Sequence, residues 1–313
     1  MIHLWKVIMV RTRYSFTLVE TMVVIAIIML LLAMIVPAIQ KVRESANRMS
    51  CQSQLRQIGI ALQQYDIDYG HLPPGRGDTL SQSEQSLSWM VLLSPYIEET
   101  SVLREAEAAC RVNSFPNINP PHRGLAAVPR LYTCPTDSRL CSPLSDVDGN
   151  LVGCSSYMGV AGSGRHTPSG LLRDGLFGAD EGKPGYKLTY CPDGLSNTIL
   201  VGERTPPDNA LAGQWYARVW YSTSQFTIMR GPDLTMYAVE VVRYPDACPG
   251  PFSFSQGRTD NPCDRYHFWS MHTGGANFLF GDCSCRFLRY SARDVLPALA
   301  SRDGGEAVTL EEP

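Results

Sequence analysis

One apolar run near the N-terminus constrains this chain more than any other stretch. Residues 16–36 contain a single charged side chain, Glu20, and three Lys or Arg residues precede the run. At a rise of 1.5 Å per residue, a helix over this run is about 31 Å long, which is enough to cross the hydrocarbon core of a bilayer. A basic flank stays on the cytoplasmic side of a membrane. We therefore expect a single transmembrane helix over residues 16–37, with the rest of the chain outside the cytoplasm.

Glu20 is the residue that an ordinary membrane segment does not need. A carboxylate inside a bilayer is costly unless a cation meets it. A secretory signal has an apolar region of about 7–15 residues that ends in a small-x-small cleavage site. This run is longer and ends at Val36-Pro37-Ala38, a poor site of that kind. The sequence therefore argues against both a cleaved secretory signal and a plain anchor.

The first residues of the run form a recognisable motif, Phe16-Thr-Leu-Val-Glu20. It closely resembles the N-terminal motif of type IV pilins and type II secretion pseudopilins, in which Gly precedes Phe-Thr-Leu-Val-Glu and an apolar helix follows. The resemblance implies that prepilin peptidase cleaves between Ser15 and Phe16, which removes residues 1–15 as a leader and leaves a methylated amine. Our hypothesis for Glu20 is assembly: the Phe16 amine of a neighbouring subunit neutralises it and fixes the stagger between subunits.

This chain departs from that motif at one position, because Ser15 stands where the family has Gly. A hydroxymethyl group at the scissile position either slows the cleavage or blocks it, so both the processed and the unprocessed chain stay open. Met9 is an alternative start, and it leaves a seven-residue leader that is closer to the length usual in the family.

Composition excludes one class of partner and indicates the redox compartment. The net charge is −3 with no block of like charge, whereas a nucleic-acid surface leaves a basic footprint. All ten cysteines follow the apolar run, on the side expected to lie outside the cytoplasm. An oxidising space favours disulfides over metal ligands, and the absence of a Cys-x-x-Cys motif makes zinc the weaker alternative. Spacing alone does not give the connectivity.

Beyond the apolar run, the pattern predicts an α+β protein. Apolar residues at spacings of three and four continue the helix to residue 70, and residues 71–313 are expected to form one head domain. A second helical region is expected over 86–109, with a restart at Ser94-Pro95, and a short helix over 293–301. Strands are expected at 198–201, 215–221 and 237–244, and a β-hairpin at 278–288. The expected fold is a long pilin-like transmembrane helix packed on a mostly antiparallel β-sheet head with long loops.

Several segments together resemble a bacterial family abundant in planctomycetes, the domain of unknown function 1559, also labelled solute-binding family 10. They are Cys51 to Tyr65, His71-Leu-Pro-Pro-Gly75, Trp89 to Glu98, Cys134-Pro-Thr-Asp137, Asp193 to Glu203, and His272 to Leu288. The likeness spans nearly the whole chain and is specific in this order. It implies a pseudopilin-like architecture with no established activity. Cys51 and Cys134 match cysteines of the family pattern, so the resemblance makes them the disulfide candidates that tie helix to head.

The family signature near the C-terminus raises the question of a metal or acid–base site at His272, Asp282 and Glu203. These residues lie on separate segments, and one His with scattered acids is not a recognised ligand motif. We favour a histidine hydrogen-bonded to an acid or to backbone. Gly274 and Gly275 indicate tight backbone. Cys283 replaces the family's Gly after Asp282, so either the turn shifts onto Gly281-Asp282 or a disulfide holds Cys283.

Asp193, Ser196 and Asn197 carry oxygen donors of the kind that calcium prefers. Turn and helix-cap chemistry explains the same three residues with fewer assumptions. We therefore expect no catalytic residue, no metal and no cofactor.

The expected function is that of a pseudopilin-like structural subunit of a type II secretion or type IV pilus-like assembly, not an enzyme. Its expected partners are the bacterial inner membrane, prepilin peptidase and other pseudopilin-like subunits or itself, with no nucleic acid. The head is expected in the periplasm or on an exported filament. One alternative is a membrane-tethered solute- or glycan-binding protein with a pocket lined by Trp89, Trp215, Trp220 or Trp269. A metal-dependent enzyme around His272 is the other.

Overall fold

The computed structural model describes residues 17–74, 87–113, 116, 121–146, 149–163, 166–167, 170–171, 174–177, 185–208, 213–216, 233–235 and 252–305. The chain divides into two compact units, Met1–Ala46 and Asn47–Pro313. The expected strand at 237–244 and most of the one at 215–221 lie outside the described residues, as do Ser15, Phe16 and Trp220. The division into a leader, a helix to residue 70 and a head stays a prediction.

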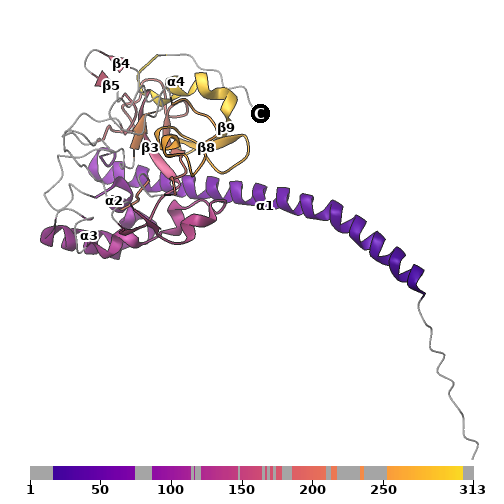
Figure 1. Cartoon of the computed structure of the whole chain (residues 1–313). Helices are drawn as coiled ribbons and strands as arrows, with labels where there is room; N and C mark the ends of the chain where they lie inside the picture. The colour runs from indigo at the N-terminus through magenta and orange to yellow at the C-terminus, as the bar shows by residue number, and fades with distance from the viewer. Residues whose placement is uncertain are drawn as a thin grey trace, which may run out of the picture. The chain divides into compact units, whose positions relative to one another are not determined.

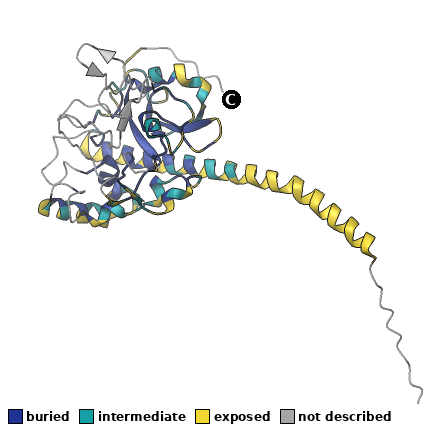
Figure 2. Cartoon of the chain, in the orientation of Figure 1, coloured by how far each residue is buried: buried dark blue, intermediate teal, exposed yellow. Residues whose placement is uncertain are grey.

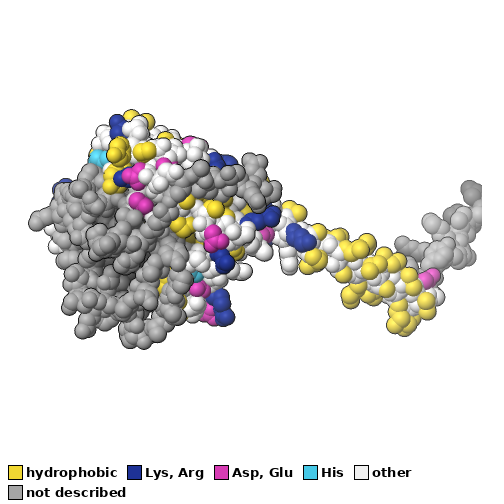
Figure 3. Space-filling view, turned by 90° about the horizontal axis from the view of Figure 1, so that it is seen from above, with side chains coloured by type: hydrophobic (Ala, Val, Ile, Leu, Met, Phe, Trp, Pro, Cys, Tyr) yellow, Lys and Arg dark blue, Asp and Glu magenta, His cyan; other side chains and the backbone are white. Residues whose placement is uncertain are grey.

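The long helix expected from the sequence is present as α1 (Leu18–Tyr69), which has 52 residues and a length of about 78 Å (Figure 1). It continues through Pro37. Residues 17–43 are all exposed, and Figure 3 shows hydrophobic side chains covering this segment, with an acidic group near its N-terminal end. By length and composition, it is the one helix of the described chain that is able to cross a membrane.

The C-terminal part of α1 has a buried face, which Figure 2 shows as dark blue turns. Its buried residues recur every three or four positions: Cys51, Leu55, Ile58, Gly59, Ala61, Leu62, Tyr65 and Asp66. The expected apolar stripe is therefore confirmed from Leu55 to Tyr65, whereas Tyr69 is 58% exposed. This face packs into the core of the head, because the same hydrophobic cluster contains Trp89, Tyr157, Val201 and Leu279.

A five-stranded sheet in the order β7-β3-β6-β8-β9 forms the centre of the head. Its strands are β3 (Tyr157–Gly162), β6 (Ile199–Glu203), β7 (Asp233–Thr235), β8 (Gly275–Phe280) and β9 (Cys285–Arg289). The β3–β6, β6–β8 and β8–β9 pairs are antiparallel, and β3–β7 is parallel. The structure thus confirms a mostly antiparallel α+β fold with a long N-terminal helix.

The three central strands β3, β6 and β8 are buried along their whole length. Alternation divides their side chains between the two faces of the sheet. On β8, Leu279 joins the cluster that contains α1, whereas Phe278 and Phe280 join a second cluster with Leu296 and Leu299. Asn277 lies two residues before Leu279 and so shares the face toward α1. A polar side chain on this face, such as that of Asn277, is therefore buried between the sheet and α1.

The helical region before the sheet differs from the expectation. The helices are α2 (Trp89–Leu92), η1 (Ser94–Ile97) and α3 (Thr100–Val112). The expected restart at Ser94-Pro95 opens only a 3₁₀ turn, which ends where Glu98 adopts a φ of 64°. A left-handed residue cannot continue a right-handed helix. The acids at 98 and 99 therefore precede α3 and do not form the first turn of a helix begun at Ser94.

Short elements complete the described chain. The 3₁₀ turns are η2 (Arg123–Ala126), η3 (Arg130–Tyr132), η4 (Ser138–Cys141), η5 (Pro262–Tyr266) and η6 (Tyr290–Asp294). Two small antiparallel pairs join β1 (Leu144–Ser145) to β2 (Leu151–Val152) and β4 (His166–Thr167) to β5 (Gly170–Leu171). The helix expected at 293–301 is shorter, α4 (Leu296–Ala300), because η6 occupies the residues before it.

The expected hairpin is present as β8 and β9, and its turn explains Cys283. The Cys283 amide donates to the Phe280 carbonyl at 3.0 Å, so Gly281 and Asp282 are the central residues of the turn. Cys283 follows with a φ of 64° and a free thiol. The turn therefore falls on Gly281-Asp282, and the alternative of a disulfide at Cys283 is wrong. The sulfur of Cys283 lies against Gly59 of α1, where a Cβ would be only 2.9 Å away.

Candidate functional site

The N-terminus of α1 is closed by a reciprocal cap between Thr17 and Glu20. The Thr17 amide and hydroxyl donate to the Glu20 carboxylate at 2.8 and 2.9 Å, and the Glu20 amide donates to the Thr17 hydroxyl at 3.3 Å. This is a capping box, in which an acid at the third helical position satisfies an amide at the helix start. The Thr-x-x-Glu spacing was visible in the sequence, but we did not predict the cap from it.

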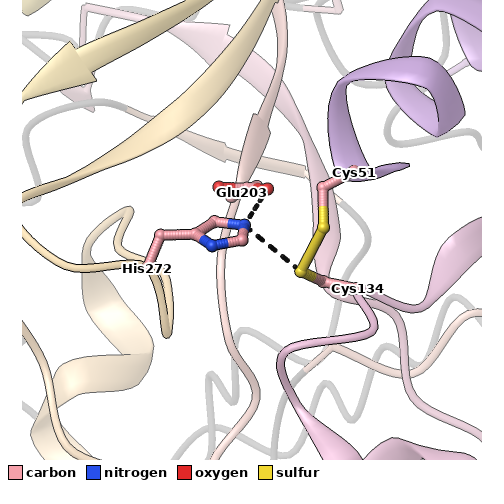
Figure 4. Close-up of side chains that lie close together, drawn as sticks. All are labelled: Cys51, Cys134, Glu203 and His272. Atoms are coloured by element: carbon pink, nitrogen blue, oxygen red, sulfur yellow. Dashed lines mark hydrogen bonds and ion pairs between the residues drawn. A yellow bond between two sulfur atoms is a disulfide. The ribbon is translucent and has the colours of Figure 1, made fainter. Parts of the chain in front are cut away.

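The second candidate site is a buried polar cluster in the head, drawn in Figure 4. A disulfide joins Cys51 of α1 to Cys134 with a Cα–Cα distance of 5.4 Å, as the family resemblance implied. The Nε2 atom of His272 lies 3.4 Å from the Cys134 sulfur and 3.4 Å from a Glu203 oxygen. Both His272 and Glu203 are 1% exposed. Four segments distant in the sequence thus meet at one point.

The Glu203 carboxylate is held by the neighbouring strand. It accepts hydrogen bonds from the Asn277 backbone amide at 2.7 Å and from the Asn277 side chain at 2.9 Å. The Asn277 side-chain oxygen in turn accepts from Gln52 of α1 at 3.0 Å. Contacts therefore run from Gln52 through Asn277, Glu203 and His272 to the disulfide, and return to α1 at Cys51. This closed ring of contacts is here called the polar ring.

The local backbone explains how His272 reaches the polar ring. Ser270 accepts from the His272 amide at 3.1 Å and donates to the Gly275 carbonyl at 2.7 Å. Gly274 has a φ of 86°, and a Cβ on Gly275 would lie 2.0 Å from the Leu288 carbonyl oxygen. The two glycines therefore allow a tight turn into β8, as expected. The His272 Nδ1 atom lies 3.4 Å from the Thr136 hydroxyl, so Nε2 faces the disulfide and Glu203.

The expected grouping of His272, Asp282 and Glu203 is only partly right. His272 and Glu203 meet, but Asp282 does not join them. It is exposed in the β8–β9 turn, at the opposite end of β8 from His272, and accepts from the Ser284 amide at 2.9 Å. Sequence spacing could not show that Glu203 reaches His272 and Asp282 does not. His272 precedes β8 and Asp282 follows it, so the full length of the strand separates these two residues.

Asp193, Ser196 and Asn197 combine a local hydrogen bond of the kind expected for a turn with bonds to distant segments of the chain. The Asp193 carboxylate accepts from the Gly304 and Gly305 amides at 2.7 and 3.0 Å. The Asn197 side chain donates to the Asp193 carbonyl at 3.1 Å, and the Ser196 carbonyl accepts from Arg286 at 3.0 Å. This region therefore fastens the segment after α4, and its carboxylate is occupied by backbone donors.

The described tryptophans of the proposed sugar pocket are core residues. Trp89, Trp215 and Trp269 are 0%, 1% and 2% exposed. The Trp215 and Trp269 indole nitrogens donate to the carbonyls of Ala127 and Asp264 at 2.5 and 3.1 Å. These three rings offer no accessible face on which a sugar could stack.

Four residues bring His, Cys or carboxylate ligand atoms close enough together for a metal ion. Within the described residues, one such group is present: Cys51, Cys134, Glu203 and His272, whose ligand atoms all lie within 4.8 Å of one another. Sequence reasoning named all four but did not bring the sulfurs to His272. It missed Asn277 and Gln52, which orient Glu203. Their only signal was that both fall inside segments of the family pattern.

These features define a class: an α+β protein with a single apolar N-terminal helix, compatible with single-pass membrane anchoring, and a disulfide-bonded head. Comparisons with known proteins agree. Residues 11–36 match the model of the prokaryotic N-terminal methylation motif, the type of motif that prepilin peptidase processes. Residues 40–294 match SBP_bac_10, described as a protein of unknown function (DUF1559). The chain belongs to this family. No curated protein and no solved structure matches it.

Proposed function

We propose that this chain is a pseudopilin-like structural subunit of a type II secretion or type IV pilus-like assembly. Residues 16–37 anchor it in the bacterial inner membrane, and the head lies in the periplasm or on an exported filament. Its partners are copies of itself or related subunits, and prepilin peptidase processes it between Ser15 and Phe16. Its role is structural, not enzymatic.

The observation that carries this proposal is Glu20, the one charged residue on an otherwise apolar and exposed segment of α1. An exposed apolar helix needs lipid or other helices around it. The Thr17 cap accounts for a hydrogen-bond acceptor at this position, but it does not require a charge, because Gln fills the same place in a capping box. A cation supplied by the neighbouring subunit accounts for the charge.

The environment of His272 supports a structural role over an enzymatic one. The His272 ring and the Glu203 carboxylate are both 1% exposed, and Nε2 of His272 contacts the Cys134 sulfur and a Glu203 oxygen. A general acid or base must lie within hydrogen-bond reach of a substrate. In this packing, the contacts of His272 fasten segments of the head together.

A pair of Glu20 variants tests the assembly role, because one keeps the cap and the other does not. Glu20→Gln retains the acceptor for Thr17 and removes the charge, whereas Glu20→Ala removes both. We expect both variants to insert in the membrane and both to lose subunit-to-subunit crosslinking through the helix. Thr17→Val is the matched control: it weakens the cap, keeps the charge and should crosslink as the wild type does. Wild-type crosslinking by Glu20→Gln would refute charge pairing.

Mass spectrometry of the purified full-length chain tests the processing step. We expect an N-terminus at a methylated Phe16. Because the family has Gly at the scissile position, Ser15→Gly should raise the processed fraction. A chain that keeps its leader in both forms would contradict the proposal.

A further inference from the structure

The polar ring contains more chemistry than a structural disulfide uses. A disulfide between α1 and the head needs only its two sulfurs and a suitable Cα–Cα distance, here 5.4 Å. Yet an imidazole lies 3.4 Å from the Cys134 sulfur and a carboxylate oxygen lies within 4.8 Å of it, and both groups are 1% exposed. Burial of a carboxylate costs several kcal/mol unless partners compensate it. A role for Glu203 and His272 toward the sulfurs would explain why these groups are there.

Two distances within the polar ring match edges of a tetrahedral metal site. With Zn–S of about 2.3 Å and Zn–N of about 2.0–2.1 Å, a tetrahedral ion sets a sulfur-to-nitrogen edge of about 3.5 Å and a nitrogen-to-oxygen edge of about 3.3 Å. The Cys134 sulfur lies 3.4 Å from His272 Nε2, which lies 3.4 Å from the Glu203 oxygen. Two thiolates on such an ion lie about 3.8 Å apart. The two sulfurs, bonded in the disulfide, are closer together than a metal site requires, and all four ligand atoms lie within 4.8 Å of one another.

The groups around the ring suit a metal site as well. Metal-bound histidine and carboxylate ligands are oriented by a further layer of hydrogen bonds. Asn277 holds both oxygens of Glu203, and Gln52 holds Asn277. The Thr136 hydroxyl lies 3.4 Å from His272 Nδ1, where its oxygen can accept a hydrogen bond from the N–H that a metal-bound imidazole carries at Nδ1. These contacts leave Nε2 directed at the sulfurs.

We propose that Cys51, Cys134, Glu203 and His272 form a Zn²⁺ site in the reduced chain, and that the disulfide and the ion are alternative occupants of one place. The two thiols of the reduced chain lose two protons as they bind the ion. The charges of the ion and the two thiolates cancel, so the net charge of the cluster stays as it is with the disulfide. Oxidation by an external disulfide takes two electrons from the thiolates, forms the Cys51–Cys134 bond and releases Zn²⁺; the external disulfide bond breaks into two thiolates, which take up two protons from solvent.

The donor set selects the type of metal. Thiolate sulfur together with imidazole favours Zn²⁺ over Ca²⁺ or Mg²⁺, which require oxygen ligands. Four protein ligands with no open position are typical of a structural zinc site. In either state, therefore, the site fastens the same turn of α1 to the head.

Cobalt absorption of the full-length chain in detergent tests this site. A phosphine reduces the disulfide without air; it becomes the phosphine oxide by taking the oxygen of one water, whose two hydrogens go to the thiols. Added Co²⁺ should then give thiolate charge-transfer bands and the visible bands of four-coordinate cobalt, with one ion per chain, and Zn²⁺ should abolish them. The oxidised chain should give none. No thiolate band from a reduced chain that keeps its native tryptophan fluorescence would overturn the proposal.

Variants locate the bound ion. Cys51→Ser/Cys134→Ser should remove the thiolate band, and Asn277→Ala should weaken Zn²⁺ binding about 10–100-fold, as loss of an orienting group does. The matched control is Cys283→Ser/Cys285→Ser, which removes two free thiols of the β8–β9 hairpin and should leave the band unchanged. A band that survives the first pair and disappears with the second would overturn the assignment.

A second measurement applies if the chain unfolds when its disulfide is reduced. In that case, Zn²⁺ should restore the native tryptophan fluorescence. It should also protect Cys51 and Cys134 from alkylation, and peptide mass spectrometry measures the alkylated fraction at each residue. Failure of Zn²⁺ both to restore the fluorescence and to protect these two thiols would overturn the proposal.

Discussion

The Cys51–Cys134 disulfide should be a major source of stability for the head, and its sequence separation gives a magnitude. The bond closes a loop with a separation of 83 residues. In the chain-entropy model, closing a loop of this length lowers the conformational entropy of the unfolded chain by about 15 cal/mol/K. This loss raises the free energy of the unfolded chain by about 4.5 kcal/mol at 25 °C. The double variant Cys51→Ala/Cys134→Ala should lose about that much free energy of unfolding.

Urea denaturation of the full-length chain in detergent measures this loss, with the fluorescence of buried Trp89 and Trp215 as the signal. For a slope of about 2–3 kcal/mol per molar urea, a loss of about 4.5 kcal/mol lowers the midpoint by about 2 M. A chelator must be present, so that a metal ion bound to the reduced cysteines does not contribute. The control is Cys141→Ala, because Cys141 is exposed and free and closes no loop.

A midpoint lowered by less than about 0.5 M would refute the loop-closure reasoning. It would mean that the apolar contacts of α1 already hold the unfolded chain in a compact form, so that the cross-link removes little of its freedom. A midpoint that falls equally in the Cys141 control would show that the signal follows loss of a thiol and not loss of the bond.

Three further predictions concern the strand β8 and its neighbours. Gly275→Ala places a Cβ 2.0 Å from the Leu288 carbonyl oxygen and should destabilise the head by about 2–4 kcal/mol, measured by the same urea titration. Asn277→Ala leaves one Glu203 oxygen without its side-chain donor and should cost about 1–3 kcal/mol, whereas an exposed Asn→Ala change should cost under about 0.5 kcal/mol. Burial, with the nearby Glu203 charge, raises the pKa of the Cys285 thiol from 9.0 to about 12. The alkylation rate of folded Cys285 should therefore rise about tenfold per pH unit from pH 8 to 11. The stability due to burial of this thiol should fall above about pH 9, where the thiol ionises in the unfolded chain but not in the folded one. An alkylation rate already at its plateau at about pH 9 would contradict this prediction.

The parts of the fold that follow local periodicity could be predicted from the sequence. Apolar residues at spacings of three and four predicted the long helix and its buried stripe from Leu55 to Tyr65. A spacing of two predicted the β8–β9 hairpin. The restart at Ser94-Pro95 was only partly right, because it opens a 3₁₀ turn that ends at the left-handed residue Glu98, and α3 begins after that residue, at Thr100. Apolar pattern and cap residues alone could not show that η1 ends before α3 begins.

The candidate site was predicted only in fragments. Cys51 and Cys134 came as a pair from the family pattern, and Glu203 and His272 came as separate signature residues. Their meeting depends on the pairing of β6 with β8 and on the packing of α1 against the same face of the sheet. Such non-local contacts leave no periodic trace in one sequence. The cap between Thr17 and Glu20 is the opposite case, since its four-residue signature was present and was overlooked.

The cross-link at Cys51 has a mechanical consequence if, as proposed, the N-terminal segment anchors the chain. Cys51 belongs to the same continuous helix as the apolar N-terminal segment, so a pull on the N-terminal end is transmitted to a covalent bond with the head. Apolar side chains slide past one another under load, whereas a sulfur–sulfur bond does not. Tension on the anchor is therefore borne by the covalent framework, and the helix cannot be drawn out of the head while that bond is intact.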